Sequence, residues 1–238
     1  MKKAIVIGAT SGIGRNLAKL LVENGYLVAI TGRRTHLLDE IKAENANSYL
    51  TKTFDTTQTL SISSNLNDLV LEMGGLDLMI ISSGTGDINS NLDFEIEKRT
   101  IDTNVSGFTS IVDWTFNFFQ TQKSGQLVAI SSIAGLRGNN QSPSYSASKA
   151  YQISYLEGIR IKAAKTNLPI YVTDIRPGFV NTEMAKGDKI FWLVPVDKAS
   201  MQIYNAILKK QKVAYITKRW VILAYIYKLL PNFLIDRA

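Results

Sequence analysis

Short apolar runs recur along the chain, and stretches whose apolar positions follow helical spacing separate them. Uninterrupted apolar strands that alternate with helices are typical of a parallel sheet covered on both faces. The pattern therefore predicts an α/β fold, a doubly wound parallel sheet in a single domain with helices on both faces. The predicted strands are Ala4–Ile7, Leu27–Thr31, Ser48–Thr53, Leu78–Ile81, Gln126–Ile130, Ile170–Ile175 and Val213–Ile216.

Chemically useful residues gather where these strands end. In an open parallel sheet the carboxyl ends of the strands form the ligand-binding edge. The sequence thus predicts a site on that edge. The residues at or just past a strand's end are Gly8, Arg33, Asp55, Gly84, Ser132 and Pro177.

Tyr145 and Lys149 lie four residues apart in the run Ser144–Lys149. On a helix, this spacing brings a phenol and an ammonium group onto one face. An unperturbed tyrosine has a pKa of about 10, and a nearby cation lowers it toward neutral pH. The pair is a candidate proton donor, although the same spacing also occurs on solvated helices. Ser132, upstream of Tyr145, adds a candidate hydroxyl donor.

A glycine-rich loop follows the first predicted strand and reads Gly8-Ala9-Thr10-Ser11-Gly12-Ile13-Gly14. A strand, turn and helix of this kind binds phosphate, because free N–H groups and the helix dipole face the anion. Gly8 permits the tight turn, Gly12 lets a pyrophosphate approach, and Gly14 lets helix and strand pack closely. The spacing differs from the commoner Gly-x-Gly-x-x-Gly, and an ordinary glycine-rich turn is the alternative.

With these motifs in place, nearly the whole chain resembles the short-chain dehydrogenase/reductase family, whose domain is a single Rossmann fold. One departure stands after the fourth strand, where the family's usual Asn-Asn-Ala-Gly is replaced by Ile81-Ser82-Ser83-Gly84. Gly84 still permits close approach of the backbone to a cofactor, but the steadying asparagine contacts do not carry over. The matching motifs are the loop Gly8–Gly14, Asp55, Asn104 in Asp102–Val105, Ser132 in Ile130–Ile133, the Tyr145/Lys149 pair and Arg176-Pro177-Gly178-Phe179-Val180-Asn181-Thr182.

The resemblance implies hydride transfer between a nicotinamide and a carbonyl or secondary alcohol. Tyr145 would exchange a proton with the substrate oxygen, and Ser132 would donate to the developing alkoxide. Lys149 would lower the pKa of the tyrosine and hydrogen-bond the nicotinamide ribose. Asn104 would hold a helix bend and a water through which the proton is replenished. Alternatively, Ser132 is a loop hydroxyl and Asn104 a polar residue inside a helix.

The resemblance also implies a set of cofactor contacts. Asp55 would face the adenine, and Val180 and Thr182 would hold the carboxamide; an N-cap of the following helix is the alternative for Asp55. The predicted cofactor-binding residues are Gly8, Thr10, Ser11, Gly12, Ile13, Gly14, Arg33, Arg34, Asp55, Ser83, Gly84, Asn104, Tyr145, Lys149, Pro177, Gly178, Val180 and Thr182.

The choice between nucleotides is predicted from Arg33 and Arg34, which end the second strand where NAD-preferring relatives carry an acidic residue. A carboxylate there would repel a 2′-phosphate, whereas a guanidinium can donate two hydrogen bonds to it. We therefore expect NADP(H) to be preferred over NAD(H). The alternative is that both arginines only solvate the helix start. Ser11 replaces a second basic residue that many NADP enzymes have, and Arg15 is close in sequence.

Composition excludes several kinds of functional site. The 238 residues contain no Cys and one His, so disulfides, thiol nucleophiles and thiolate metal sites are excluded, and His36 is expected to be solvated on a helix. Met1-Lys2-Lys3 leads directly into the first strand, so a cytoplasmic protein is expected. The formal charge of +7 suits a phosphorylated cofactor, an acyl substrate on an acidic carrier or an anionic lipid surface. No nucleic-acid-binding motif accompanies this charge.

The segment after the sixth strand is predicted to form a substrate lid at about 181–197, within a catalytic domain at 1–217. Its apolar side chains favour a hydrophobic ketone, aldehyde or 3-oxoacyl group, with packing on the sheet as the alternative. Gly187 is a candidate hinge. The apolar lid residues are Met184, Ile190, Phe191, Trp192 and Leu193.

The tail, 218–238, is hydrophobic and basic, and three interpretations of its run Lys218–Pro231 stay open. It forms a helix packed over the substrate cleft or against a sister subunit, an interfacial helix on a membrane surface, or a marginal membrane span. Lys228 interrupts the run, which argues against the span.

Assembly and the rival function are also left open. The resemblance implies a homodimer or homotetramer paired through helices that begin near Arg99 and Tyr145. The rival to an enzyme is a non-catalytic NADP-binding sensor or scaffold, which the altered Ile81–Gly84 segment suggests and the intact Asn104, Ser132, Tyr145 and Lys149 argue against. Apolar residues that line such a seam or lie buried in the monomer are Val112, Phe116, Phe119, Ile153, Leu156 and Ile161.

Overall fold

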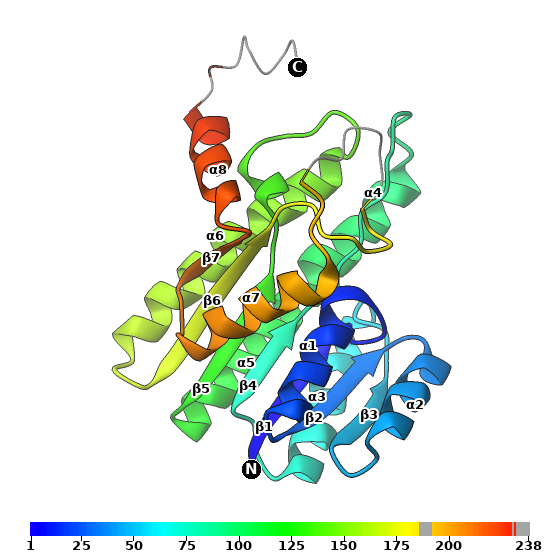
Figure 1. Ribbon diagram of the computed structural model, residues 1–238, viewed down its shortest axis with the longest axis vertical. Coiled ribbons are helices and arrows are strands. Elements are labelled where there is room, and N and C mark those ends of the chain that lie inside the picture. The colour runs from blue at the N-terminus through cyan, green and yellow to red at the C-terminus, as the bar shows by residue number, and fades with distance from the viewer. Residues whose placement is uncertain (186–191, 230, 232–238) are drawn as a thin grey trace.

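The computed structural model describes residues 1–185, 192–229 and 231. The described residues form one sheet of seven parallel strands in the order β3-β2-β1-β4-β5-β6-β7 (Figure 1). The doubly wound fold predicted from the hydrophobic pattern is therefore confirmed. The strands are β1 Lys2–Ile7, β2 Tyr26–Gly32, β3 Tyr49–Thr53, β4 Leu78–Ile81, β5 Gly125–Ile130, β6 Ile170–Pro177 and β7 Val213–Ile216.

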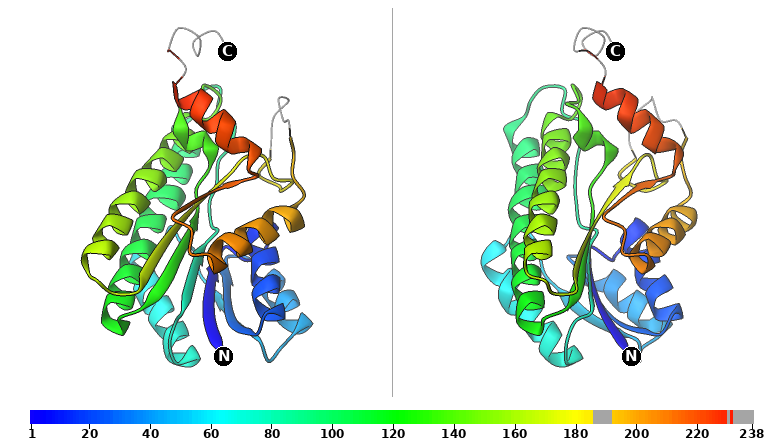
Figure 2. Two further views of the ribbon diagram at one scale, coloured as in Figure 1. Left: turned by 60° about the vertical axis from the view of Figure 1, so that its left-hand side comes forward. Right: turned by 90° about the vertical axis from the view of Figure 1, so that its left-hand side faces the viewer.

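Helices cover both faces of this sheet, with α1, α2 and α7 on one face and α3, α5 and α6 on the other (Figure 2). The α-helices are α1 Gly12–Glu23, α2 Thr35–Glu44, α3 Thr59–Met73, α4 Phe94–Ile101, α5 Phe108–Gln122, α6 Pro143–Lys165, α7 Val196–Leu208 and α8 Arg219–Leu229; η1 Asp102–Gly107 is a π-helix and η2 Ile133–Leu136 a 3₁₀-helix.

The continuous apolar character of the strands follows from this double cover. In β1, Ala4 and Val6 lie in the core under α1 and α7, whereas Ile5 and Ile7 lie in the core under α3 and α5. Successive side chains of a strand point to opposite faces, so a strand buried on both faces has no polar position to alternate with.

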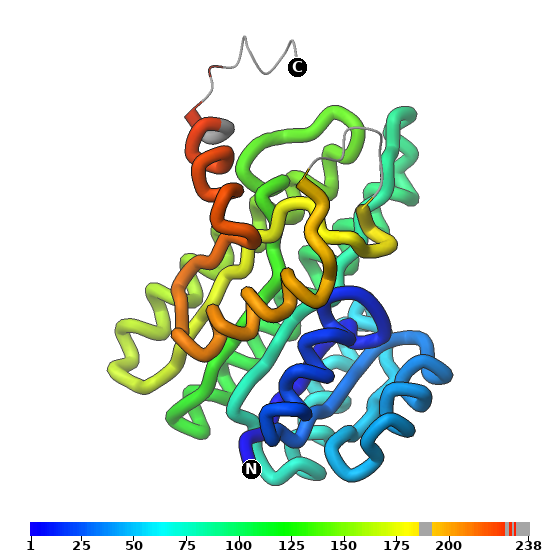
Figure 3. The backbone as a smooth tube through the Cα atoms, in the orientation of Figure 1, coloured from blue at the N-terminus to red at the C-terminus, as the bar shows by residue number. Residues whose placement is uncertain are grey.

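The strand order reverses between β2-β1 and β4-β5, because β1 pairs with both β2 and β4. At such a reversal, the loops after β1 and β4 diverge to opposite faces and leave a crevice. Figure 3 shows the segments that follow β4, β5 and β6, together with α8, at the same end of the sheet.

The structure shows where most of the apolar residues considered for a subunit interface on the long helices α5 and α6 lie. Val112, Phe116, Phe119 and Leu156 are buried in the core of the monomer, whereas Ile161 is exposed. The first four are therefore core residues. Pairing of subunits through α5 and α6 stays a prediction.

Within the described ranges, no helix has the length and apolar character needed to cross a membrane. The marginal span considered for the tail is not supported by α8. The predicted lid residues Gly187, Ile190 and Phe191 and the tail residues 230 and 232–238 lie outside the described residues.

Candidate active site

A single large cleft of about 2170 Å³ opens at the carboxyl edge of the sheet. Its walls come from the loops after β1, β2, β4, β5 and β6 and from α8. Ordinary small-molecule pockets measure about 300–1,000 Å³, so the cleft has room for a dinucleotide and a second molecule.

The glycine loop forms one end of the cleft, and its glycines are required by close contacts. Gly8 has φ +81° and lies so near β4's end that a methyl group on it would be 2.6 Å from Ser83 N. A methyl group on Gly14 would lie 2.2 Å from Gly8 O. Ser11 precedes α1 without capping it through its side chain, so the first N–H groups of α1 remain available to an anion.

Arg34 folds over this loop from the end of β2. Its guanidinium donates to Thr10 Oγ1 at 2.7 Å and to Ser11 Oγ at 2.9 Å. Arg33 extends into the cleft mouth, where its side chain is 73% exposed and lies 3.6 Å from Asp55. Both arginines line the cleft. Arg15 does not join them, since it pairs with Glu44 at 2.9 Å outside the cleft.

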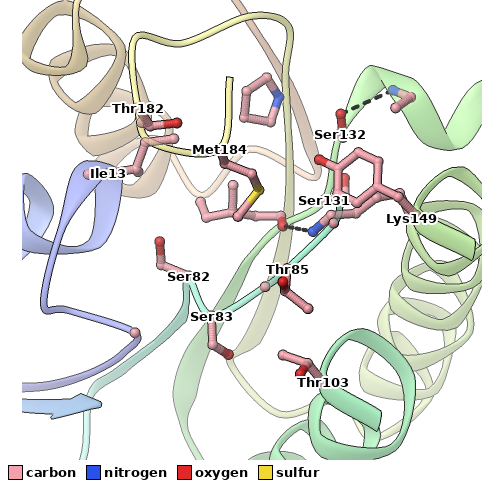
Figure 4. A pocket seen from close by; sticks show the side chains of 18 of the residues that line it. Ile13, Ser82, Ser83, Thr85, Thr103, Ser131, Ser132, Lys149, Thr182 and Met184 are labelled. Carbon is pink, nitrogen blue, oxygen red and sulfur yellow. Dashed lines mark hydrogen bonds between the residues drawn. The ribbon is translucent and has the colours of Figure 1, made fainter. Parts of the chain in front are cut away.

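Tyr145 and Ser132 meet on the opposite wall, where their hydroxyl groups share a hydrogen bond. Figure 4 shows Ser132 and Lys149 across the pocket from Ile13 and Thr182. Ser132 is placed by η2, where its Oγ accepts a hydrogen bond from Ala134 N at 3.1 Å. Two hydroxyl groups therefore point at one place beside the nucleotide-sized cleft, and that place suits a substrate oxygen.

Lys149 lies behind Tyr145, with its ammonium 5.8 Å from the centre of the tyrosine ring. The ammonium donates to Ile130 O at 3.0 Å and to Gln152 Oε1 at 2.9 Å. Burial lowers the pKa of Lys149 to about 8, and the nearby carboxylate of Asp174 opposes this shift. The amine is thus charged at neutral pH and close to its titration point.

The predicted electrostatic effect on Tyr145 differs in the structure. Burial raises the pKa of Tyr145, and the hydrogen bond with Ser132 is the influence that lowers it. Two of the hydrogen bonds of Lys149 point to Ile130 and Gln152, away from the phenol. In the protein alone, Tyr145 is therefore held protonated, which is the state a proton donor for carbonyl reduction needs.

Asn104 lies in the π-helix η1, between α4 and α5, and is fully buried. Its side-chain amide binds both backbone groups of Thr85, donating to the oxygen at 2.6 Å and accepting from the nitrogen at 2.9 Å. It also donates to Ser148 Oγ at 3.0 Å. These bonds hold the loop after β4 against α6, which supplies a connection where the usual asparagines of that loop are missing.

A second buried charge network lies under the site. Arg176 Nε donates to Asp174 Oδ2 at 2.6 Å, and Ser131 Oγ donates to Asp174 Oδ1 at 2.5 Å. Arg176 also donates to Tyr215 OH at 3.0 Å, which ties β6 to β7. Because Asp174 is buried and acts on the pKa of Lys149, the negative charge of this network reaches the wall that carries Lys149 and Tyr145.

Comparison with known proteins decides the family. The sequence profile of the short chain dehydrogenase family matches residues 2–190. This chain belongs to the short-chain dehydrogenases. An uncharacterized oxidoreductase of Myxococcus xanthus is 35% identical over 188 residues, which cover 77% of this chain and 74% of the relative. Another, from Staphylococcus saprophyticus, is 31% identical over 213 residues, covering 85% of this chain and 90% of the relative.

Solved structures agree on the fold of this dehydrogenase. A short-chain dehydrogenase from Streptomyces avermitilis superposes with a TM-score of 0.85 at 22% identity and covers 95% of this chain and 92% of its own. A structure of ElxO with NADP bound superposes with a TM-score of 0.80 at 22% identity, over 91% of this chain and 97% of its own. With the family established, the protein is an oxidoreductase that acts on CH–OH groups.

Most of the residues predicted for the dehydrogenase site line the cleft together. Asn104 and Gly14 lie behind its wall, where they hold the loops that form it. Asp55 serves a turn as well, because its Oδ1 accepts from Thr57 N at 2.9 Å. The predicted residues at the cleft surface are Gly8, Thr10, Ser11, Gly12, Ile13, Arg33, Arg34, Asp55, Ser83, Gly84, Ser132, Tyr145, Lys149, Pro177, Gly178, Val180 and Thr182.

Sequence reasoning missed two residues that shape the dehydrogenase site. Gly86 lies against the ring of Tyr145, and Gln152 holds Lys149. The signal for Gln152 was present, because a polar residue three positions after Lys149 falls on the buried face of the same helix. Gly86 had no such signal, since its contact is set by the path of the loop after β4.

Part of the cleft wall is apolar. Trp220, Leu223, Ala224 and Ile226 of α8 line it together with Met184. The tail helix α8 therefore lines part of the cleft, and its packing over a substrate there stays a prediction. His36 is exposed on α2, and the described residues include no group of three His, Asp or Glu side chains able to hold a metal ion.

Proposed function

We propose that this dehydrogenase is an NADP(H)-dependent reductase of apolar ketones, aldehydes or 3-oxoacyl groups. The observation that carries the proposal is the hydrogen-bonded pair of Tyr145 and Ser132 on the wall of a cleft whose other end is a phosphate-binding loop. The residues present fit a nicotinamide dinucleotide, because glycine contacts, free N–H groups of α1 and two arginines occupy one end of the cleft.

Each side chain then has one task in the reaction. The nicotinamide, when bound, supplies the hydride. Tyr145 OH donates its proton to the carbonyl oxygen, and Ser132 Oγ donates a hydrogen bond to the same oxygen as negative charge develops. Lys149 keeps a positive charge behind the phenol and favours the phenolate that remains.

The preference for NADP(H) rests on Arg33, Arg34 and Ser11. A 2′-phosphate beside the adenine ribose would meet two guanidinium groups and a hydroxyl. Two carboxylates lie nearby, and each is paired with an arginine, Asp55 with Arg33 at 3.6 Å and Glu183 with Arg34 at 3.9 Å. The NADP seen in the ElxO structure supports this choice. Dissociation constants for NADPH and NADH in the wild type and in Arg33→Asp test it: we expect tighter NADPH binding that the variant loses, and equal wild-type affinities would contradict the preference.

The substrate class rests on the apolar wall of the cleft. Met184, Trp220 and Leu223 offer side chains without charge to the cleft. Such a wall favours a hydrophobic carbonyl compound over a sugar.

The outer face of α8 supports a peripheral contact with an anionic membrane surface. Lys218 and Arg219 stand exposed at the start of the helix. Exposed apolar side chains spaced along one helical face are those of Ile222, Tyr225 and Leu229. Co-sedimentation with phosphatidylglycerol vesicles, with Ile222→Asp as the comparison, tests the contact: wild type should sediment and the variant should not.

The deciding experiment is loss of NADPH absorbance across a panel of alkyl ketones, aromatic aldehydes and 3-oxoacyl thioesters. Tyr145→Phe should remove most turnover and keep NADPH binding. Binding of NADPH without turnover of any compound in the panel would instead favour the non-catalytic sensor.

A further inference from the structure

Gln152 forms a bridge that the family resemblance did not predict. It lies one turn after Lys149 on α6 and is 1% exposed. Its Oε1 accepts a hydrogen bond from Lys149 Nζ at 2.9 Å, and its Nε2 donates to Asn104 O at 2.9 Å. An ammonium can only donate and a backbone carbonyl can only accept, so the two partners fix the orientation of the amide.

This bridge leaves one N–H of the Lys149 ammonium to bind another group. The ammonium has three N–H groups, and Ile130 O and Gln152 Oε1 take two of them. The ammonium also approaches Gly84 at the cleft, since a methyl group there would lie 3.5 Å from Nζ. The remaining N–H is thus left for the cleft side, where a ribose hydroxyl would bind.

The same bridge acts on the charge of Lys149. Burial disfavours the ammonium, whereas an amide oxygen in direct contact favours it. Two titratable groups face Lys149 from the described elements, Tyr145 on its own helix and Asp174 on β6. Two neighbouring elements present neutral groups: β5 offers the carbonyl of Ile130, and the amide of Asn104 in η1 approaches Lys149 Nζ at Gly84.

The resemblance assigned to Asn104 a water in the proton path, and the backbone oxygen of this residue is part of the bridge. In the structure, it accepts the N–H of Gln152. A primary amide holds its hydrogen bonds but does not pass a proton on as water does, so the bridge serves position rather than relay.

We propose that Gln152 is a positioning residue of this dehydrogenase: its amide holds the ammonium of Lys149 toward the cofactor and in its charged form, anchored on the π-helix at Asn104. The inference rests on the proposed role of Lys149. Gln152 itself touches neither the substrate nor the cofactor end of the cleft.

Two variants distinguish the hydrogen bond of Gln152 to Lys149 from its hydrogen bond to Asn104. Gln152→Met has similar length and removes both hydrogen bonds. Gln152→Glu keeps an oxygen for Lys149. Thr115→Val is the matched control, since Thr115 is a fully buried polar residue of α5 that bonds only within its helix, to Ile111 O at 2.7 Å.

The first measurement needs no cofactor or substrate. Lysine-labelled protein is titrated by NMR, and the Lys149 signal is assigned by its absence in Lys149→Arg. We expect the titration midpoint in Gln152→Met to fall by about one pH unit, because a hydrogen bond to a charged group contributes about 1.5–3 kcal/mol. The midpoint in Gln152→Glu should equal or exceed that of wild type, and Thr115→Val should leave it unchanged. A folded Gln152→Met with the wild-type midpoint overturns the proposal.

The second measurement uses NADPH and whichever panel compound is reduced. Gln152→Met should lower kcat about 10-fold with KM for the carbonyl compound changed less than about 3-fold, and Gln152→Glu should recover part of the loss. Loss of activity that follows thermal stability equally in Gln152→Met and Thr115→Val would overturn the positioning role. If Lys149→Met retains turnover, the proposed role of Lys149 is wrong. If Lys149→Met is inactive and the Gln152 variants have normal activity, only the positioning role of Gln152 is wrong.

Discussion

Gly86 lies directly against the phenol ring of Tyr145, so that a methyl group on Gly86 would be 2.3 Å from Tyr145 Cδ2. No side chain fits between the loop after β4 and this ring. The contact limits where the phenol can lie relative to Ser132, so the loop after β4 would affect the proposed proton donation.

Gly86→Ala should therefore displace the ring of Tyr145 and lower kcat by about 10- to 100-fold, because a shift of about 1 Å in a reacting group costs up to about 100-fold in rate. NADPH binding should change little. Steady-state kinetics and fluorescence titration with NADPH check these two outcomes.

Gly158→Ala is the matched control for this prediction. Gly158 lies on α6 with Tyr145, and nothing lies within 4 Å of a methyl group placed on it. The variant should keep full activity and gain about 0.5–1 kcal/mol of stability, because alanine suits a helix interior better than glycine. Equal losses in both variants would mean that the contact with Tyr145 is not what matters at Gly86.

The buried amine of Lys149 should make stability depend on pH. Its pKa is lowered from 10.5 to about 8 in the folded protein, so between these values the unfolded chain binds more protons than the folded one. Stability from this group is therefore fully present above pH 10.5 and is lost as pH falls through about 8.

Urea unfolding at several pH values, compared between wild type and Lys149→Met, checks this sign. Between pH 8 and 10, the free energy of unfolding of the wild type should rise by about 1 kcal/mol per pH unit relative to that of the variant. A difference that shrinks with rising pH would contradict the lowered pKa.

Arg34 should select the phosphorylated nucleotide through its position over the glycine loop. Removing its guanidinium in Arg34→Ala should weaken NADPH binding by about 10- to 100-fold and leave NADH binding nearly unchanged, since charge-assisted hydrogen bonds contribute about 1.5–3 kcal/mol. Isothermal titration with both nucleotides measures the two effects.

Arg15→Ala controls for the loss of one positive charge near α1. Arg15 pairs with Glu44 away from the cleft, so its removal should affect both nucleotides alike and by less than about 3-fold. A loss of NADPH binding as large as that of Arg34→Ala would show that net charge, and not the placed guanidinium, sets the affinity.

Trp220 should hold α8 at the apolar wall of the cleft. Its ring packs edge-to-face with Phe179 at 5.8 Å and Trp192 at 5.6 Å between ring centres. Trp220→Ala should loosen α8 and raise KM for long alkyl ketones more than for short ones, with NADPH binding retained. Hydrogen exchange over residues 219–229 and KM across a chain-length series measure both effects.

Tyr225→Ala provides the comparison on the same helix, because Tyr225 is 64% exposed on the outer face of α8. Its exchange rates and KM values should match those of wild type. Unchanged KM values in Trp220→Ala, despite faster exchange in α8, would remove the tail helix from substrate binding.

The hydrophobic pattern predicted the sheet closely, because strand formation here follows from local runs that need burial on both faces. Each of the seven predicted strands corresponds to an observed one, and the polar residues at their ends meet in one cleft. Helical spacing likewise placed Tyr145 and Lys149 on one face, since four residues on a helix fix their relative direction wherever the helix lies.

Other features depended on contacts between distant segments. Four of the apolar residues of α5 and α6 considered for a subunit seam proved to be core residues, among them Phe119 and Leu156. Amphipathic spacing shows that a face is buried but not what buries it. For the same reason, the sequence did not separate Arg34, which binds the glycine loop, from Arg15, which does not.

Local spacing was thus enough to establish which residues belong to strands and helices, which ends of the strands carry the chemistry, and which two side chains share a helical face, because these relations act over a few residues. Packing alone settled what surrounds the amine of Lys149. Gln152 and Asn104 are 48 positions apart in the chain, and their hydrogen bond exists only because α6 and the π-helix lie side by side. Periodicity carries no information about such a contact, since it depends on how the elements are brought together across the sheet.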